Sequence, residues 1–131
     1  MNKFNRLIIS LVIILALLFS FSSCLPFYYY EKPHELELIG DVSMRYVYNE
    51  EFECYDVYLE GIAENITGKD MTGCSVCFII YDNDGNVIGI ADDYINNLKA
   101  DAKWRFAASG TTGYEPARFE LEELYGYDYN N

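Results

Sequence analysis

Residues 74–90, CSVCFIIYDNDGNVIGI, decide the fold of this chain. Residues 74–81 form the most apolar run after position 24, and residues 87–90 form a second apolar run. The short segment between them, DNDG, suits a turn because its residues accept a positive φ. The stretch therefore predicts a β-hairpin, and we expect the Asp82 side chain to cap the turn that ends at Gly85.

Alternation along residues 74–81 predicts which side chains of the first hairpin strand are buried. Successive side chains of a strand point to opposite faces, so Val76, Phe78 and Ile80 share one face. We expect that face to lie in the core and Tyr81 to point the other way. Trp104 and Phe106 also share a face, and we expect Trp104 to pack in the core rather than bind a ligand.

The same alternation recurs on both sides of the hairpin. The expected strands are residues 35–38, 42–48, 52–63, 104–107 and 118–122. Polar or small residues indicate loops at 65–73, 92–98 and 109–113, and long helical periodicity is absent after position 24. Several short strands with regularly spaced turns predict an all-β fold, a single Ig-like antiparallel β-sandwich over residues 35–125. Residues 126–131 are expected to form a Tyr-rich C-terminal tail, either frayed or an exposed strand.

Motifs spread over residues 57–124 are similar to those of one family of domains. Phe78, Tyr81 and Asp82 stand in the order Phe-x-Leu-Tyr-Asp, with Ile80 at the Leu position. The full set of matching positions is Gly61, Asn65, Phe78, Ile80, Tyr81, Asp82, Gly85, Leu98 and Phe106, and Asp101 stands where a turn glycine is usual. On these positions the chain resembles the FxLYD domain, an extracytoplasmic β-sandwich of bacterial and archaeal surface proteins. The resemblance implies structural roles for these residues and supplies no catalytic residue.

The first residues have the pattern of a secretory signal peptide. Lys3 and Arg6 precede an apolar run over residues 7–21, which is shorter than the roughly 20 residues of a spanning helix. Residues 21–24, Phe-Ser-Ser-Cys, resemble a bacterial lipobox with Phe in place of Leu. The resemblance implies that a signal peptide, residues 1–23, is cut between Ser23 and Cys24, and that the thiol of Cys24 carries a diacylglyceryl group. An uncleaved signal anchor and an ordinary cleaved signal stay open as alternatives.

Residues 24–34 are expected to be the lipidated Cys24 followed by a short aromatic tether bounded by Pro26 and Pro33. Its tyrosines suit a membrane interface, and they equally suit a first strand or packed segment. In the lipoprotein family, Leu25 in place of an aspartate favours the outer membrane in Gram-negative bacteria. The expected location is therefore the cell membrane or the outer membrane, extracytoplasmic and lipid-anchored.

The charge of the chain excludes one class of partner. The 131 residues carry a formal net charge of −12. Removal of residues 1–23 takes away Lys3 and Arg6 and no acid, which leaves a net charge of about −14 from seven bases and 21 acids. Phosphates repel a domain this acidic, so nucleic-acid binding is excluded. The expected partners are the membrane, through the N-terminal lipid, and a protein or glycan that the sequence does not identify.

Once Cys24 is lipidated, three cysteines remain. An odd count allows one internal disulfide at most, and Cys54 pairs with Cys74, with Cys77 or with neither. Cys74 and Cys77 have the spacing of a redox pair, but such pairs open helices, whereas this one lies on a predicted strand. Their odd offset would place the two thiols on opposite faces of that strand.

The sequence offers no constellation for catalysis. His34 is the single histidine and lies in the tether, so histidine triads and paired-histidine metal sites are excluded. If Gly85 is aligned with the turn glycine of an EF-hand, Ile80 and Ala91 fall where acids are required. No metal and no cofactor are expected. We therefore expect a lipid-anchored, non-catalytic envelope domain presented for protein or surface interaction. The alternatives are a glycan or small-ligand binding lipoprotein that uses tyrosine faces and, third, a thiol-based redox protein.

Overall fold

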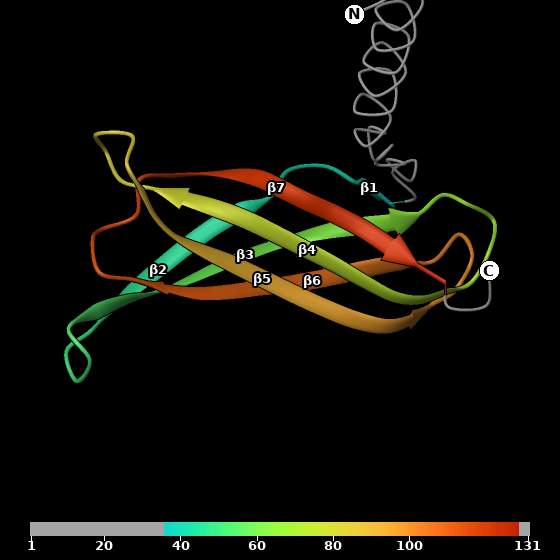
Figure 1. Cartoon of the computed structure of the whole chain (residues 1–131), viewed down its shortest axis with the longest axis horizontal. Helices are drawn as coiled ribbons and strands as arrows, with labels where there is room; N and C mark the ends of the chain where they lie inside the picture. The colour runs from blue at the N-terminus through green and yellow to red at the C-terminus, as the bar shows by residue number, and fades with distance from the viewer. Residues whose placement is uncertain (1–35, 129–131) are drawn as a thin grey trace, which may run out of the picture. The chain divides into compact units, whose positions relative to one another are not determined.

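The computed structural model describes residues 36–128, which form seven strands (Figure 1). The strands are β1 (Leu36–Leu38), β2 (Ser43–Asn49), β3 (Cys54–Asn65), β4 (Met71–Tyr81), β5 (Val87–Leu98), β6 (Lys103–Thr112) and β7 (Arg118–Tyr127). The signal peptide, the Ser23–Cys24 cleavage and lipidation site, the tether with His34 and the last residues of the tail lie outside the described residues.

All seven strands belong to one antiparallel sheet that nearly closes on itself. The strand order is β1-β3-β6-β5-β4-β7, and β2 also pairs with β3, beside β1. The two end strands of this order, β1 and β7, come back into contact, so the sheet curls into a barrel-like shape (Figure 1). The expectation of an all-β antiparallel domain is confirmed.

The curl depends on a narrow junction between β5 and β6. Only one residue pair, Asp92 with Ser109, joins these strands in backbone register. Beside it, the Asp93 carboxylate accepts a hydrogen bond from the Ala107 N–H at 2.8 Å. A Cβ atom at Gly110 would collide with the carbonyl oxygen of Ile90, so only glycine allows this approach of the two strands.

The core lies inside the curl, and Phe106 contacts two other aromatic rings there. Phe106 lies 5.8 Å from Trp104 and 5.7 Å from Phe78, measured between ring centroids. Val76, Phe78 and Ile80 are fully buried, as their alternation predicts, and Trp104 is a core residue. A Cβ atom at Gly61 would lie 2.5 Å from Cζ of Phe106, so a bare backbone at this position leaves room for the ring.

The hairpin predicted around residues 82–85 is confirmed. Oδ1 of Asp82 accepts hydrogen bonds from the backbone N–H groups of Asp84, at 2.9 Å, and Asn86, at 2.8 Å. Hydrogen bonds from Asn86 and from the turn backbone lower the pKa of Asp82 below its ordinary value. Gly85 has a φ of 84° and Asp101 a φ of 57°, so both positions adopt the left-handed conformation that the motif suggested.

Two segments predicted as loops are strands, and those predictions are wrong. Residues 92–98 continue β5, because they pair with the first half of β4 although their outward side chains are polar. Most of residues 109–113 belong to β6. Gly110 allows β6 to approach β5 closely and is not part of a flexible loop. At the C-terminus, Gly126 and Tyr127 continue β7, which agrees with the exposed-strand alternative for the start of the Tyr-rich segment.

Candidate functional site

Asn65 joins three segments at the end of the domain where β1 begins. Its buried amide Nδ2 donates to the backbone carbonyls of Lys69 at 2.7 Å, Leu98 at 3.3 Å and Lys99 at 3.1 Å. Its Oδ1 accepts from the backbone N–H of Thr67 at 3.1 Å. We call this end, residues 36, 65–70, 98–103 and 127–128, the entry end. Asn65 holds its loops together, and Leu98 is buried beneath them.

The remaining motif residues do not meet in one site. Phe78, Ile80 and Phe106 are parts of the core, and Gly61 lies against the Phe106 ring. Asp82 and Gly85 shape the turn between β4 and β5. Tyr81 points outward, and its ring lies 3.7 Å from the guanidinium carbon of Arg118. The motif therefore describes a scaffold.

The cysteines do not form a reactive pair. Cys54, Cys74 and Cys77 make no disulfide with one another. Cys74 is buried with its thiol 3.6 Å from the Met71 sulfur, whereas Cys77 lies on the outer face, as their odd offset predicts. Burial, followed by the carboxylates of Asp92 and Glu123, raises the pKa of the Cys77 thiol. A raised pKa lowers the thiolate fraction at neutral pH and does not favour thiol chemistry.

Acidic residues do not gather into a metal site in the part of the chain that the structure describes. Within residues 36–128, no group of three or more His, Cys, Asp or Glu side chains is placed to hold an ion. Both oxygens of the Asp82 carboxylate accept hydrogen bonds within its own turn.

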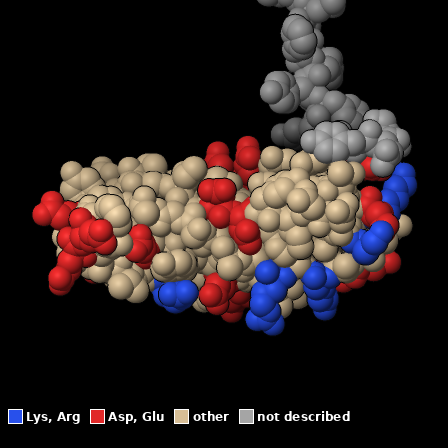
Figure 2. Space-filling view, turned by 90° about the horizontal axis from the view of Figure 1, so that it is seen from below, with Lys and Arg blue, Asp and Glu red and all other residues tan. Residues whose placement is uncertain are grey.

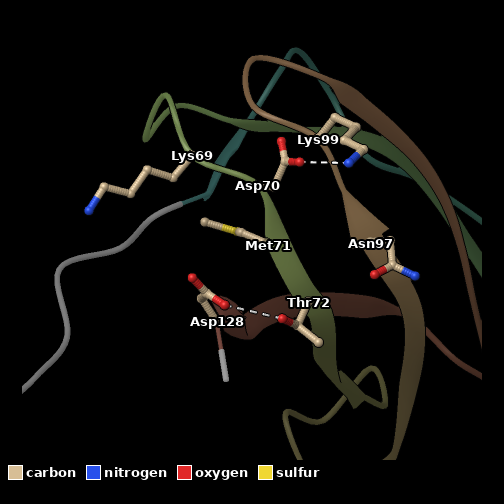
Figure 3. Close-up of a pocket in the computed structure, with 7 residues that line it drawn as sticks. All are labelled: Lys69, Asp70, Met71, Thr72, Asn97, Lys99 and Asp128. Atoms are coloured by element: carbon tan, nitrogen blue, oxygen red, sulfur yellow. Dashed lines mark hydrogen bonds and ion pairs between the residues drawn. The ribbon is translucent and has the colours of Figure 1, made fainter. Parts of the chain in front are cut away.

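A depression of about 500 Å³ lies at the entry end (Figure 3). It is lined by Lys69, Asp70, Met71, Thr72, Asn97, Lys99 and Asp128. Lys99 Nζ lies 2.6 Å from Oδ2 of Asp70, and the Ala100 N–H donates to Oδ1 of Asp70 at 3.0 Å. Both hydrogen bonds lower the pKa of Asp70, and the bond from Lys99 has the larger effect. The carboxylates pair with neighbours in the domain, and Lys69 points away from them (Figure 3).

The opposite end of the domain exposes aromatic rings. We call Tyr46, Tyr48, Phe52, Tyr55 and Tyr114 the aromatic tip. The Tyr55 ring lies 5.9 Å from Tyr46 and 5.0 Å from Tyr48, between centroids. Tyr48 is 49%, Phe52 69% and Tyr114 70% exposed. Tyr48 and Phe52 lie beside or in the β2–β3 turn, residues 50–53, which projects from this end of the domain (Figure 1).

A recess of about 430 Å³ opens beside the tip. We call it the Tyr46 recess; it is lined by Tyr46, Asn83, Glu115, Pro116 and Ala117. The Tyr46 hydroxyl donates to Oε1 of Glu115 at 2.9 Å, and this bond raises the pKa of Tyr46. The loop carrying Glu115 is fixed by a hydrogen bond from the Ala117 N–H to the Tyr81 carbonyl at 2.9 Å.

The sequence did not single out this recess. In β2, Tyr46 and Tyr48 lie on the face that points toward the core. Tyr46 is paired with Val57 of β3, and Tyr48 is paired with Tyr55. Alternation alone would bury them. Their exposure fits the position of β2 at the edge of the sheet, where it pairs with β3 alone within residues 36–128, and the sequence gives no signal for that position.

A second tyrosine surface lies on the outer face of β5, β4 and β7. The hydroxyls of Tyr94 and Tyr127 are 2.6 Å apart, and the rings of Tyr125 and Tyr127 lie 6.4 Å apart, between centroids. A Cβ atom at Gly73 would lie 2.5 Å from the Tyr127 ring, so this ring covers the glycine of β4. The tyrosines expected to alternate near the C-terminus thus stand on an ordered strand as far as Tyr127.

Acidic side chains gather at the end of the domain that carries the aromatic tip. Figure 2 shows acidic side chains at this end and also further along the domain, whereas the Lys and Arg side chains of that view lie away from this end. In the described residues, no helix has the length and apolar character required to cross a membrane.

Comparisons with protein-family models, with curated proteins and with solved structures find no match to this chain. The likeness to the FxLYD domain therefore depends on the motif residues alone.

Proposed function

We propose that this chain is a lipid-anchored, non-catalytic domain of the cell envelope, presented for interaction with a protein or another surface. The observation that carries the proposal is the aromatic tip, which lies at the opposite end from Leu36. An anchor at Cys24 would join the domain through Leu36. The exposed rings would then stand at the end away from the attachment.

The physical character of the tip supports an interaction role. Contiguous exposed apolar surface is uncommon on soluble proteins and marks contact sites. Tyrosine gives a large contact area with little loss of conformational entropy, and aromatic residues are common among those that dominate interface energies. At the tip, the Tyr55 ring contacts the rings of Tyr46 and Tyr48. The tip also contains the exposed Phe52, in the β2–β3 turn.

An Ig-like sandwich of the FxLYD type is the finer fold that we propose. The support for it is that the sheet divides into two parts. One part contains β1, β2, β3 and β6, and the other contains β4, β5 and β7. A single pair of residues joins the two parts in backbone register. The core side chains of the two parts face one another, as Phe78 of β4 and Phe106 of β6 do. This arrangement fits the two packed layers of a sandwich.

The experiment that tests the anchor compares the wild-type chain with Cys24→Ser in the host envelope. The wild type should give a mature N-terminal peptide with an acylated cysteine, by mass spectrometry, and should fractionate with membranes. Cys24→Ser should lose both, because each buried acyl methylene contributes about 0.8 kcal/mol to the anchor. A Cys24→Ser protein that matures normally and stays with membranes would contradict the anchor.

The experiment that tests the tip uses crosslinking in intact envelopes. Tyr48→Ser with Phe52→Ser should reduce crosslinking to macromolecular partners at least several-fold while membrane fractionation is unchanged. Tyr94→Ser is the matched control, since it removes an exposed tyrosine at 48% exposure from another face. Equal crosslinking by the tip and control variants would show that the tip is not the contact surface.

A second candidate function, glycan or small-ligand binding, is favoured by the Tyr94, Tyr125 and Tyr127 surface. Its rings lie side by side on one sheet face, and their hydroxyls are linked. Binding on a glycan array that is lost in Tyr125→Ala and kept in Tyr48→Ala would support this candidate. Silence of the wild-type chain on the array would remove it.

A further inference from the structure

Arg118 shows how this domain holds a cation on its own surface. Its guanidinium carbon lies 3.7 Å from the centre of the Tyr81 ring, and its NH1 lies 2.6 Å from Oε1 of Glu120. The Tyr81 hydroxyl donates to the other oxygen of Glu120 at 2.8 Å. Ring, carboxylate and guanidinium therefore form a closed set of three contacts, in which stacking and a charge-assisted hydrogen bond act together.

A second arginine is held in a related way. The guanidinium carbon of Arg45 lies 4.1 Å from the centre of the Tyr58 ring, and NH2 of Arg45 lies 3.9 Å from Oε1 of Glu60. Within residues 36–128, Arg45 and Arg118 therefore each contact a tyrosine ring and a glutamate carboxylate.

Tyr46 and Glu115 repeat the tyrosine–glutamate part of the first arrangement. The Tyr46 hydroxyl donates to Oε1 of Glu115 at 2.9 Å, close to the 2.8 Å between Tyr81 and Glu120. The Tyr46 ring is 39% exposed, and the pair borders the recess of about 430 Å³. Within residues 36–128, neither side chain contacts a Lys or Arg.

The surroundings of the Tyr46 recess favour a positive charge. The three connecting segments at this end, residues 50–53, 82–86 and 113–117, contain Glu50, Glu51, Glu53, Asp82, Asp84 and Glu115 and no Lys or Arg. Acidic groups on one face attract a cation over a distance set by ionic strength. Pro116 and Ala117 add an apolar wall that suits the methylene stem of a long basic side chain.

We propose that the Tyr46 recess binds a basic side chain, arginine in preference to lysine, from a protein segment that docks on the aromatic tip. The guanidinium stacks on the Tyr46 ring while it hydrogen-bonds Glu115, as Arg118 does with Tyr81 and Glu120. Arginine is preferred because its planar group stacks and donates in parallel, whereas an ammonium is a point charge. This proposal rests on the proposed function, since it names the chemistry that the tip recognises.

The test measures binding of a short labelled peptide to the full chain in detergent micelles, by fluorescence anisotropy. The probe is an uncharged Gly/Ser peptide with one arginine flanked by leucines, and the comparison peptides carry lysine or glutamine at that position. We expect the arginine peptide to bind several-fold more tightly than the lysine peptide. Glu115→Gln and Tyr46→Ala should each weaken it by about tenfold.

Three controls separate the recess from general acidity and from misfolding. Glu123→Gln removes the same charge from another face and should leave the affinity unchanged. Tyr46→Phe keeps the ring and should retain most of the binding, and thermal melts should show that all variants remain folded. Equal weakening by Glu115→Gln and Glu123→Gln would overturn the proposal, and so would equal affinity for the arginine and glutamine peptides.

The outcomes also separate this proposal from the function on which it rests. Peptide binding without arginine preference, together with crosslinking lost in the tip variants, would overturn the recess and leave the tip as the contact surface. Arginine-selective peptide binding with crosslinking unchanged in the tip variants would support the recess chemistry and contradict the role of the tip as the contact surface in the envelope. A neutral glycan that displaces the arginine peptide from the recess with similar affinity would also overturn the inference.

Discussion

The entry end and the aromatic tip differ in how their polar and charged side chains are paired. At the entry end the buried Asn65 amide meets carbonyls of three residues, and Asp70 is paired with Lys99. At the tip, Phe52 and Tyr114 are mostly exposed, and Glu115 bonds a tyrosine rather than a cation. One end satisfies its polar groups within the chain, whereas the other leaves rings and negative charge facing outward.

The contrast indicates where stability and recognition lie in this domain. Buried polar groups destabilise a fold when their partners are removed, whereas exposed side chains can change with little effect on folding. Substitutions at the entry end should therefore alter unfolding, and substitutions at the tip should alter binding. We expect the effect on the free energy of unfolding to decrease from Asn65 to Asp70 to Phe52.

The largest effect is expected for Asn65→Asp. A carboxylate of the same size has no N–H to donate to the carbonyls of Lys69, Leu98 and Lys99, and it repels them. We expect a loss of about 1–3 kcal/mol in the free energy of unfolding, measured with urea on the full chain in detergent. The control is Asn96→Asp, because the Asn96 oxygen only accepts from Tyr94 and a carboxylate does so equally well. Similar losses in both variants would contradict the role assigned to Asn65.

A smaller, pH-dependent effect is expected for the Asp70–Lys99 pair. The folded pKa of Asp70 is lowered, so its stabilising contribution is complete above the unfolded pKa of about 4. The contribution is lost as the pH falls through the folded pKa. The stability difference between wild type and Asp70→Asn should therefore be present at neutral pH and vanish in acid. A double-mutant cycle with Lys99→Met should show coupling at neutral pH only; coupling that persists in strong acid would contradict this prediction.

The smallest effect on stability is expected for Phe52→Ser. Its ring is 69% exposed at the β2–β3 turn, so the free energy of unfolding should change by no more than about 0.5 kcal/mol. Phe119→Ser is the comparison, because the Phe119 ring packs edge-on at 5.7 Å from Phe78. Thermal melts of the two variants should differ clearly. A melting temperature lowered equally in both would show that Phe52 is part of the folded core.

Much of the fold follows from alternation and turn chemistry. The buried face of Val76, Phe78 and Ile80 and the Asp82 turn are local properties of short segments, and both predictions are confirmed. The left-handed φ of Asp101 was likewise suggested by a single motif position. Local pattern is sufficient here because each feature depends on residues only a few positions apart.

Other features depend on contacts that the sequence does not display. Residues 92–98 look like a loop because Asp92, Asp93 and Asn96 are polar, but pairing with β4 and the Ala107 amide makes them strand. The sequence around Gly110 predicts a loop, but Gly110 lies in β6 and allows β5 to approach that strand closely. The Tyr46 recess brings together β2 and two loops, and Tyr46 and Glu115 are 69 positions apart. Such juxtapositions are tertiary and leave no local signature.

The free side of β2 has a consequence for how the protein behaves in concentrated samples. Within residues 36–128, β2 pairs with β3 alone, so its other side presents unpaired backbone groups beside Val47, which is 57% exposed. Such an edge is a template for strand addition between molecules, and the strong negative charge of the chain opposes it. Because added salt screens that repulsion, crowded stocks should stay monodisperse in dilute buffer and begin to aggregate edge to edge as the ionic strength rises.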